Sequence, residues 1–297
     1  MPGSRIERVQ TTGTAPKSVA SPAPAYPIFT LGGVLRHVIL IAIGVAFLSP
    51  FVWLVLASVD AHAGWGVRLP DLTVDNYRAV LSQRGLTALK NSCFLAFVTS
   101  VIATGLGYLA AYALSRRHVP LKRGIMLTIL FASGLPVSLL LVPTYQMYVA
   151  FGWLDSLFTT SLFLAAGALP FAIWMLKNFI DAVPLELEEA ALVEGAGTWQ
   201  TLLRVTVPLT LPGLSVTGIY TFIAAWGAFI APLILDGNPD DEPAPIAIFH
   251  FMGNHGEFLF GQLAAYSLMF SAPVIILYFA LSRQFSGAFA FGGGLKG

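Results

Sequence analysis

Charge is scarce in this sequence. Only 10% of its 297 residues are Asp, Glu, Lys or Arg, whereas 56% are hydrophobic; an ordinary soluble domain carries about 25% charged residues. A soluble domain of this length would have too little polar surface to cover itself. The net charge of +1 also offers no basic surface for nucleic acid. The composition therefore argues against a soluble enzyme, a disordered chain and a nucleic-acid-binding protein.

The residues that carry enzymatic chemistry are also missing in the required patterns. A single cysteine, Cys93, excludes an intramolecular disulfide, and the five histidines form no His-Glu-x-x-His pair. The chain has neither a Gly-x-Ser-x-Gly elbow nor a Gly-x-x-x-x-Gly-Lys-Ser/Thr phosphate loop. We therefore predict no catalytic residue, no metal site and no cofactor site in this chain.

The few charges are unevenly spread, and six long windows contain none at all. A membrane-spanning helix needs about 20 apolar residues, and every one of these windows is that long. The six windows are residues 37–59, 91–115, 124–154, 156–176, 205–235 and 258–282. The sequence thus predicts an all-α integral membrane protein with six transmembrane helices. Residues 1–33 are expected to form a flexible cytoplasmic tail, and residues 34–297 the transmembrane domain.

The basic residues set the expected orientation. With the N-terminus inside, 12 of the 16 Lys and Arg residues fall in inner segments, four of them between residues 116 and 123. Because short inner loops carry the excess of Lys and Arg, an N-in and C-in topology is favoured. The protein is then a multi-pass protein of the plasma membrane, in contact with lipid.

The windows contain no intramembrane charge, and two of them contain prolines. A proton- or sodium-coupled carrier often needs a carboxylate within the membrane, so that class loses weight, although backbone carbonyls can also bind sodium. Pro136 and Pro143 are expected to bend the helix of window 124–154. In window 205–235 we expect residues 205–212 to lie at the membrane interface.

The inner loop 177–204 has the pattern of a helix–turn–helix lying against the inner face. Pro184 suits the first turn of a helix, and Glu186, Glu188 and Glu189 complement the positive end of its dipole. Gly195 fits a left-handed C-terminal cap, and Thr198 can cap a second short helix. The loop is either a solvated connector or a docking element for a soluble partner.

A resemblance favours docking. Glu189-Ala190-Ala191, followed after three residues by Gly195 and later by Pro208 and Pro212, resembles the EAA loop of bacterial ABC importer permeases. The likeness extends over most of the chain after about residue 34, and its sugar-importer features include Asn76-Tyr77, Asn91-Ser92 and Leu135-Pro136. The ending 292–297 is similar to the glycine-rich Lys-Gly tail of the smaller maltose-type permease.

The chain departs from the family pattern at three positions. Glu194 stands where Asp is usual, Leu202 replaces a common Phe, and Gly227 follows Trp226 where Asn is frequent. The first two changes keep charge or apolarity. The third removes a polar group near the expected pathway and bears on sugar specificity.

The resemblance implies a type I importer permease fold and a set of partners. These are a second permease subunit, forming a heterodimer, a homodimeric ATP-binding subunit and an extracytoplasmic solute-binding protein. ATP would be bound and hydrolysed by the partner, so this chain is expected not to be an enzyme. Segment 181–205 would couple this chain to the ATP-binding subunit, through Glu189, Ala190, Ala191, Glu194 and Gly195. The alternative is an ion-coupled secondary carrier of a small polar solute.

The cargo implied by the resemblance is a sugar, either a di- or oligosaccharide or a related polyol or glycerol phosphate. Sugars are recognised by hydrogen bonds and aromatic faces. Candidate pathway residues of that kind are Tyr145, Tyr220 and Trp226, each of which could equally serve helix packing or placement at the interface.

Overall fold

The computed structural model describes residues 31–64, 66, 69–81, 83–252 and 258–292, and this described part is helical apart from turns and one isolated bridge between Asp60 and Leu72. The tail 1–30 and the ending 293–297 lie outside it. Contacts divide the chain into residues 1–51 and 52–297. Its helices are α1 (Leu31–Ser58), α2 (Asp75–Val80), α3 (Gln83–Arg116), α4 (Lys122–Ser133), η1 (Val137–Leu140), α5 (Leu141–Phe151), α6 (Leu157–Asp181), α7 (Leu185–Val193), α8 (Thr198–Thr201), η2 (Leu202–Thr206), α9 (Val207–Leu209), α10 (Leu211–Trp226), α11 (Ile230–Leu235), α12 (Ala244–Ala247), η3 (Ile248–Met252) and α13 (Phe260–Gly292).

Four of these helices are long and apolar enough to cross a membrane. They cover Gly33–Ser58, Arg84–Arg116, Leu157–Asp181 and Phe260–Ala280. Two further stretches qualify only as bent pairs, Lys122–Ser133 with Val137–Phe151, and Thr198–Leu209 with Leu211–Trp226. Counting each pair as one crossing gives the predicted six, and the expected all-α membrane fold is confirmed. The first helix begins at Leu31, three residues before the expected domain boundary.

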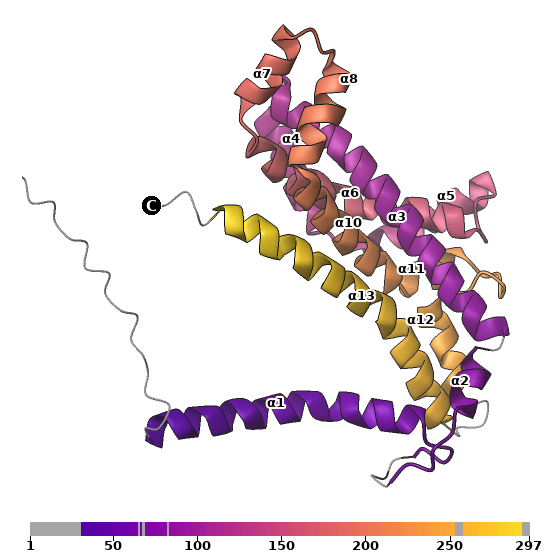
Figure 1. Cartoon of the computed structure of the whole chain (residues 1–297). Coiled ribbons are helices and arrows are strands. Elements are labelled where there is room, and N and C mark those ends of the chain that lie inside the picture. The colour runs from indigo at the N-terminus through magenta and orange to yellow at the C-terminus, as the bar shows by residue number, and fades with distance from the viewer. Residues whose placement is uncertain (1–30, 65, 67–68, 82, 253–257, 293–297) are drawn as a thin grey trace, which may run out of the picture. The chain divides into compact units, whose positions relative to one another are not determined.

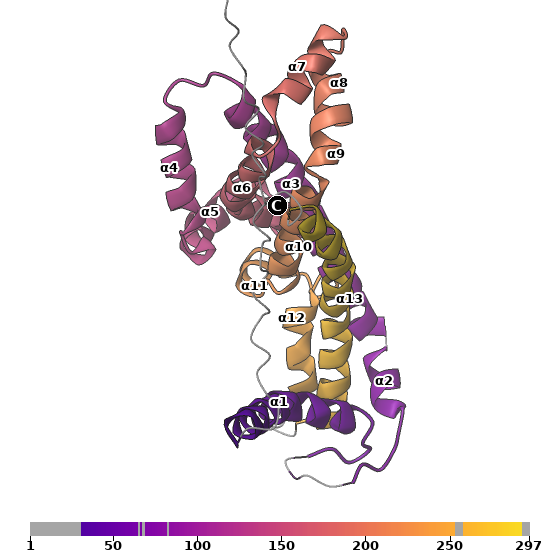
Figure 2. The same cartoon turned by 60° about the vertical axis from the view of Figure 1, so that its left-hand side comes forward.

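The first bent pair turns by 95° between α4 and η1 (Figure 2). Helix α4 ends at Ser133, and Pro136, extended with φ −61° and ψ 121°, directly precedes the restart of the helix at Val137. The bend expected at Pro136 is confirmed. The bend expected at Pro143 is wrong, because this residue is the third of α5, within the first turn, whose N–H groups need no intrahelical partner.

The second bent pair turns by 77° around Thr210. Ahead of the turn, η2 is a π-helical stretch of five residues that leads into α9. Window 205–235 therefore holds the end of one short helix, the 16-residue helix α10 and the six-residue helix α11. The charge-free window alone did not reveal these breaks.

Small residues bring α3 and α6 together. Gly107 lies so close to α6 that a Cβ added to it would be 2.9 Å from the Cβ of Ala172. Helices in membranes associate through close contacts of this kind, because lipid gives no hydrophobic drive for apolar side chains to leave it. Helix α10 packs on the same α3, where the Ser100 hydroxyl donates to the Gly218 carbonyl at 2.7 Å.

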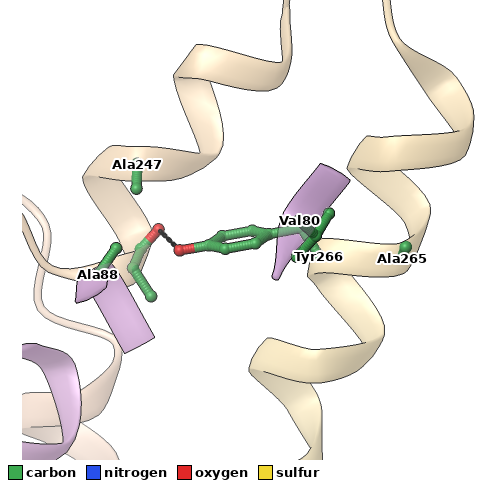
Figure 3. Packing of buried hydrophobic residues seen from close by; sticks show 6 residues of the cluster. Val80, Ala88, Ala247, Ala265 and Tyr266 are labelled. Atoms are coloured by element: carbon green, nitrogen blue, oxygen red, sulfur yellow. Dashed lines mark hydrogen bonds between the residues drawn. The ribbon is translucent and has the colours of Figure 1, made fainter. Parts of the chain in front are cut away.

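At one end of α3, a second group of helices packs around Tyr266 of α13. The Tyr266 ring is fully buried among Val80, Ala88, Ala247 and Ala265 (Figure 3). Its hydroxyl donates to the Ala244 carbonyl at 3.3 Å, which satisfies the buried polar tip. This cluster ties α2, α12 and α13 to the beginning of α3.

The neighbouring loop 236–252 is also held to α3. The Asn91 side chain donates to the carbonyls of Asp240 and Glu242 at 2.8 and 3.2 Å. The Ser92 hydroxyl accepts the N–H of Ala244 at 2.7 Å. Asn91 and Ser92, noted in the sequence only for their family likeness, thus fix this loop.

Candidate functional site

Helices α7 and α8 form a helix–turn–helix at the end of α3 opposite to α2 and α12 (Figure 1). Pro184 precedes α7 in an extended conformation with ψ 133°. Gly195 follows the helix with φ +91°. The N–H of Gly195 donates to the Leu192 carbonyl, and the N–H of Ala196 donates to the Ala191 carbonyl, both at 3.0 Å. These bonds form a Schellman cap, which needs a left-handed residue at this position. The turn expected at Gly195 is confirmed.

The second helix of the pair is capped differently from the expectation. The N-cap of α8 is Gly197, and Thr198 is the first residue of the helix. The N–H of Gly197 donates to Oε1 of Gln200 at 3.0 Å. Thr198 accepts instead from Arg117 at 3.3 Å. The cap expected at Thr198 is therefore wrong by one residue: the N-cap is Gly197, whose N–H is satisfied by the side chain of Gln200.

Glu188 is the residue that fixes α7 in place. Its Oε1 accepts from Nε of Arg116 at 2.8 Å and from the Thr206 hydroxyl at 3.1 Å, and its Oε2 accepts from the Tyr112 hydroxyl at 3.1 Å. The side chains of Arg116 and Glu188 are only 11% and 5% exposed. A buried carboxylate is costly unless it is paired and hydrogen-bonded, and Glu188 is both.

Arg116 extends the network to the end of α6. Its Nη2 donates to the carbonyls of Ile180 and Val183 at 2.9 and 2.8 Å. One guanidinium on α3 therefore binds the last turn of α6, the connection to α7 and α7 itself. Sequence reasoning missed this role for both residues. It assigned Glu188 to the helix dipole, and it noted Arg116 as part of the basic cluster and of the likeness to the sugar-importer permeases.

The next residue along α7 points elsewhere. Successive residues of an α-helix are rotated by about 100°, and Glu189 is exposed where Glu188 is buried. Of the other predicted coupling residues, Ala190, Glu194 and Gly195 are exposed and Ala191 is half-buried. All of the five predicted coupling residues except Ala191 are therefore accessible on α7 and its C-terminal cap.

Apolar side chains lie exposed on the same helix pair. Val193 is 88% exposed and Trp199 is 64% exposed, with Leu192 and Leu203 also accessible. These exposed apolar side chains are available for contact with a partner protein or with the membrane surface.

The three predicted pathway residues have different surroundings. Tyr145 on α5 and Tyr220 on α10 are exposed, and the Tyr220 ring lies 4.2 Å from that of Phe171. Trp226 is buried, stacked on Phe270, and its indole N–H donates to the Phe270 carbonyl at 3.1 Å. The structure therefore accounts for Trp226 through packing, and leaves the two tyrosines accessible.

A buried carboxyl group lies in the loop that follows α11. Asp236 is 6% exposed, and its Oδ2 has no hydrogen-bond partner among the described residues. Burial, together with the negative charges of Asp241 and Asp155, raises the pKa of Asp236 to about 6.

Within the described residues, no group of three or more His, Cys, Asp or Glu side chains is arranged to bind a metal ion.

These features define the class of protein: a multi-span helical membrane protein with broken spans and an exposed helix–turn–helix anchored by a buried ion pair. The comparisons give the family. Residues 103–287 match the model of the binding-protein-dependent transport system inner membrane component. The chain belongs to this family, that of ABC transporter permease components, and its place is the inner membrane.

Two relatives and one solved structure illustrate the similarity. The chain is 33% identical to the trehalose transport system permease protein SugB of Mycobacterium tuberculosis, over 82% of this chain and 90% of the relative. It is 30% identical to the trehalose/maltose transport system permease protein MalG of Thermococcus litoralis, over 89% and 98%. A bacterial ABC transporter involved in alginate import shares the fold, with a TM-score of 0.71 and 22% identity over 87% of this chain and 99% of the other.

Proposed function

We propose that this chain is the permease subunit of an ATP-driven importer that carries a sugar across the bacterial plasma membrane. Two relatives that match this chain over most of their own length are named for the transport of trehalose or of trehalose and maltose. These names support a sugar as the cargo. The alternative, an ion-coupled secondary carrier, is not favoured, because the family is that of binding-protein-dependent transport systems.

The partners in this proposal are those of such a system. A second permease subunit pairs with this chain as a heterodimer, two copies of an ATP-binding subunit bind ATP and hydrolyse it, and an extracytoplasmic solute-binding protein delivers the sugar. The permease itself is not an enzyme and needs no cofactor. Its task is to turn movement of the ATPase into movement of its membrane helices.

One observation carries the coupling step. Helix α7 is fixed on one side, where Glu188 binds Arg116, and free on the other, where Glu189, Ala190 and Glu194 are exposed. A segment that transmits force needs both a surface to be pushed and a rigid attachment to what it moves. In our proposal the ATPase contacts Glu189, Ala190, Ala191, Glu194 and Gly195, and Arg116 passes the motion to α3.

The test is uptake by the complete transporter in proteoliposomes with its binding protein. Labelled trehalose and maltose serve as probes, and methionine serves as a non-sugar control. Wild-type transporter should import at least one of the two sugars in an ATP-dependent manner. Glu189→Lys and Gly195→Pro should abolish uptake, because one reverses the contact charge and the other destroys the cap, while the chain still inserts in the membrane.

The matched control is Glu186→Lys, a charge reversal at another exposed residue of α7 outside the proposed contact set. It should keep wild-type uptake and co-purify with the ATPase. Normal uptake by both Glu189→Lys and Gly195→Pro would show that the coupling contact is assigned to the wrong residues.

A further inference from the structure

The 95° break between α4 and η1 lies in the middle of a charge-free stretch. Peptide groups freed by such a break cannot remain in contact with lipid, because hydrocarbon offers no hydrogen-bond partner. Breaks at this depth are therefore found where the backbone is covered by protein or lines a cavity. Ser133 and Val137, the residues that flank this break, both line a cavity of about 320 Å³.

The other walls come from the middle of three spans. Thr99 lies near the centre of α3, Phe171 near the centre of α6, and Tyr220 with Thr221 near the centre of α10. The cavity is therefore expected at mid-membrane depth, where transported solutes are commonly bound between helices. No Asp, Glu, Lys, Arg or His is among its lining residues.

The serine and threonine hydroxyls of the lining are already committed as donors. Ser133 donates to the Leu130 carbonyl at 2.7 Å, and Thr99 donates to the Ser161 carbonyl at 3.3 Å. The Thr221 hydroxyl bonds the Thr217 carbonyl at 3.0 Å. Each oxygen keeps acceptor capacity after its single proton is used. The cavity thus offers uncharged acceptors, which suit a neutral ligand that donates several hydrogen bonds.

The aromatic side of the cavity complements the same ligand. The rings of Phe171 and Tyr220 lie 4.2 Å apart at 33°, and the electron-rich face of an aromatic ring attracts the slightly positive C–H groups of a partner. Tyr220 is 54% exposed, and among the described residues its hydroxyl has no hydrogen-bond partner. A sugar ring has both an apolar C–H face and donating hydroxyls.

We propose that this cavity is a subsite for one ring of the transported sugar, with Tyr220 and Ser133 as its contacting side chains. The proposal rests on the proposed function and adds the place in this chain at which the cargo is recognised. It selects Tyr220 from the three predicted pathway residues and adds Ser133, which the sequence did not single out.

The experiment measures uptake of labelled trehalose and maltose by the complete transporter in proteoliposomes, per assembled complex. Tyr220→Phe and Ser133→Ala each remove one hydroxyl and keep the remaining shape. Each should lower the maximal rate about three- to tenfold, the effect of one lost hydrogen bond. The KM should be unchanged, because the binding protein captures the sugar before it reaches the membrane.

Two matched controls carry the same changes elsewhere. Tyr278→Phe alters an exposed tyrosine next to Phe279 on α13. Ser49→Ala alters an exposed serine on α1 that, like Ser133, donates to the carbonyl three residues earlier. Both controls should import at the wild-type rate.

The outcomes separate the two levels of the proposal. If wild-type transporter imports sugar and the two test variants match their controls, the subsite is refuted and the proposed function stands. If the wild type imports neither sugar, the proposed function fails and the subsite fails with it.

Discussion

Nε of Arg116 lies 2.8 Å from Oε1 of Glu188, across 72 residues of sequence. The pair joins the end of α3 to the middle of α7 in surroundings where both side chains are nearly buried. In our proposal, it is the contact through which a push on α7 would reach the membrane-spanning helix α3.

Breaking this pair should disable transport. Glu188→Gln leaves the buried Arg116 charge without its counter-ion, which costs about 3–5 kcal/mol when a buried pair loses one partner. We expect α7 to detach from α3 and uptake to fall to background, with faster protease cleavage between residues 181 and 205. Glu186→Gln, the same change at an exposed residue of α7, should leave uptake and cleavage unchanged. Equal behaviour of the two variants would contradict the role of Glu188.

The cap at Gly195 gives a milder test of the same segment. Gly195→Ala forces a side chain into the left-handed region, at a cost of about 1–2 kcal/mol, so uptake should decrease without being lost. Gly197→Ala is the control, because Gly197 has φ −76° and open space around it. The measurement is the uptake rate of each variant per assembled complex, and we expect a lower rate for Gly195→Ala than for Gly197→Ala. A larger loss at position 197 would argue against the cap.

The buried carboxyl of Asp236 predicts a pH dependence. Its folded-state pKa of about 6 lies above the ordinary 3.8, so folding favours the protonated form, and the stabilisation present below pH 3.8 is lost as pH rises through 6. The shift corresponds to about 3 kcal/mol at most. Protease cleavage within loop 236–252 should therefore be slower at pH 5 than at pH 7.5.

Asp236→Asn should abolish this difference and protect the loop at both pH values. Asp240→Asn, at an exposed aspartate of the same loop, should keep the wild-type dependence. A pH dependence that survives in Asp236→Asn would assign the titration to another group.

Trp226 is expected to act through stability. Trp226→Ala removes a buried indole that stacks on Phe270 and donates to its carbonyl, and such truncations cost about 3–5 kcal/mol. Trp226→Phe keeps the stacking and loses one hydrogen bond, worth about 1 kcal/mol. The thermal midpoint of the purified complex should fall strongly in the first variant and slightly in the second. If Trp226→Phe instead keeps the midpoint but loses uptake, Trp226 serves the pathway.

The contact of α3 with α6 should tolerate no larger side chain. Gly107→Val would place its Cβ 2.9 Å from that of Ala172, and overpacking typically costs about 1–3 kcal/mol. Gly105→Val, two residues earlier on α3, meets nothing within 4 Å. We expect a lower thermal midpoint for the first variant only, measured on the purified complex. Equal midpoints would mean that α6 can move away.

The sequence predicted best those features that depend on local composition. Charge-free runs gave the long helices α1, α3, α6 and α13, and Pro136 and Gly195 gave the main break and the cap, since both depend on backbone rules that act within a few residues. The N-in and C-in orientation and the assignment of the coupling residues remain predictions.

The features that the sequence did not reveal depend on distant partners. In the local sequence, nothing distinguishes Glu188 from another acidic residue in the first turn of a helix, such as Glu186. Only the fold brings Arg116 next to it. Ser133 and Tyr220, 87 positions apart, line the same cavity because α4 and α10 both pack against α6. Trp226 became a packing residue because α13 supplies Phe270.

The anchoring of α7 by Glu188 means that the helix–turn–helix is not a self-contained module. A coupling segment transplanted from another importer would need a carboxylate at the position of Glu188, because Arg116, Tyr112 and Thr206 all donate hydrogen bonds to it here. A loop without that carboxylate would have to be exchanged together with the end of α3.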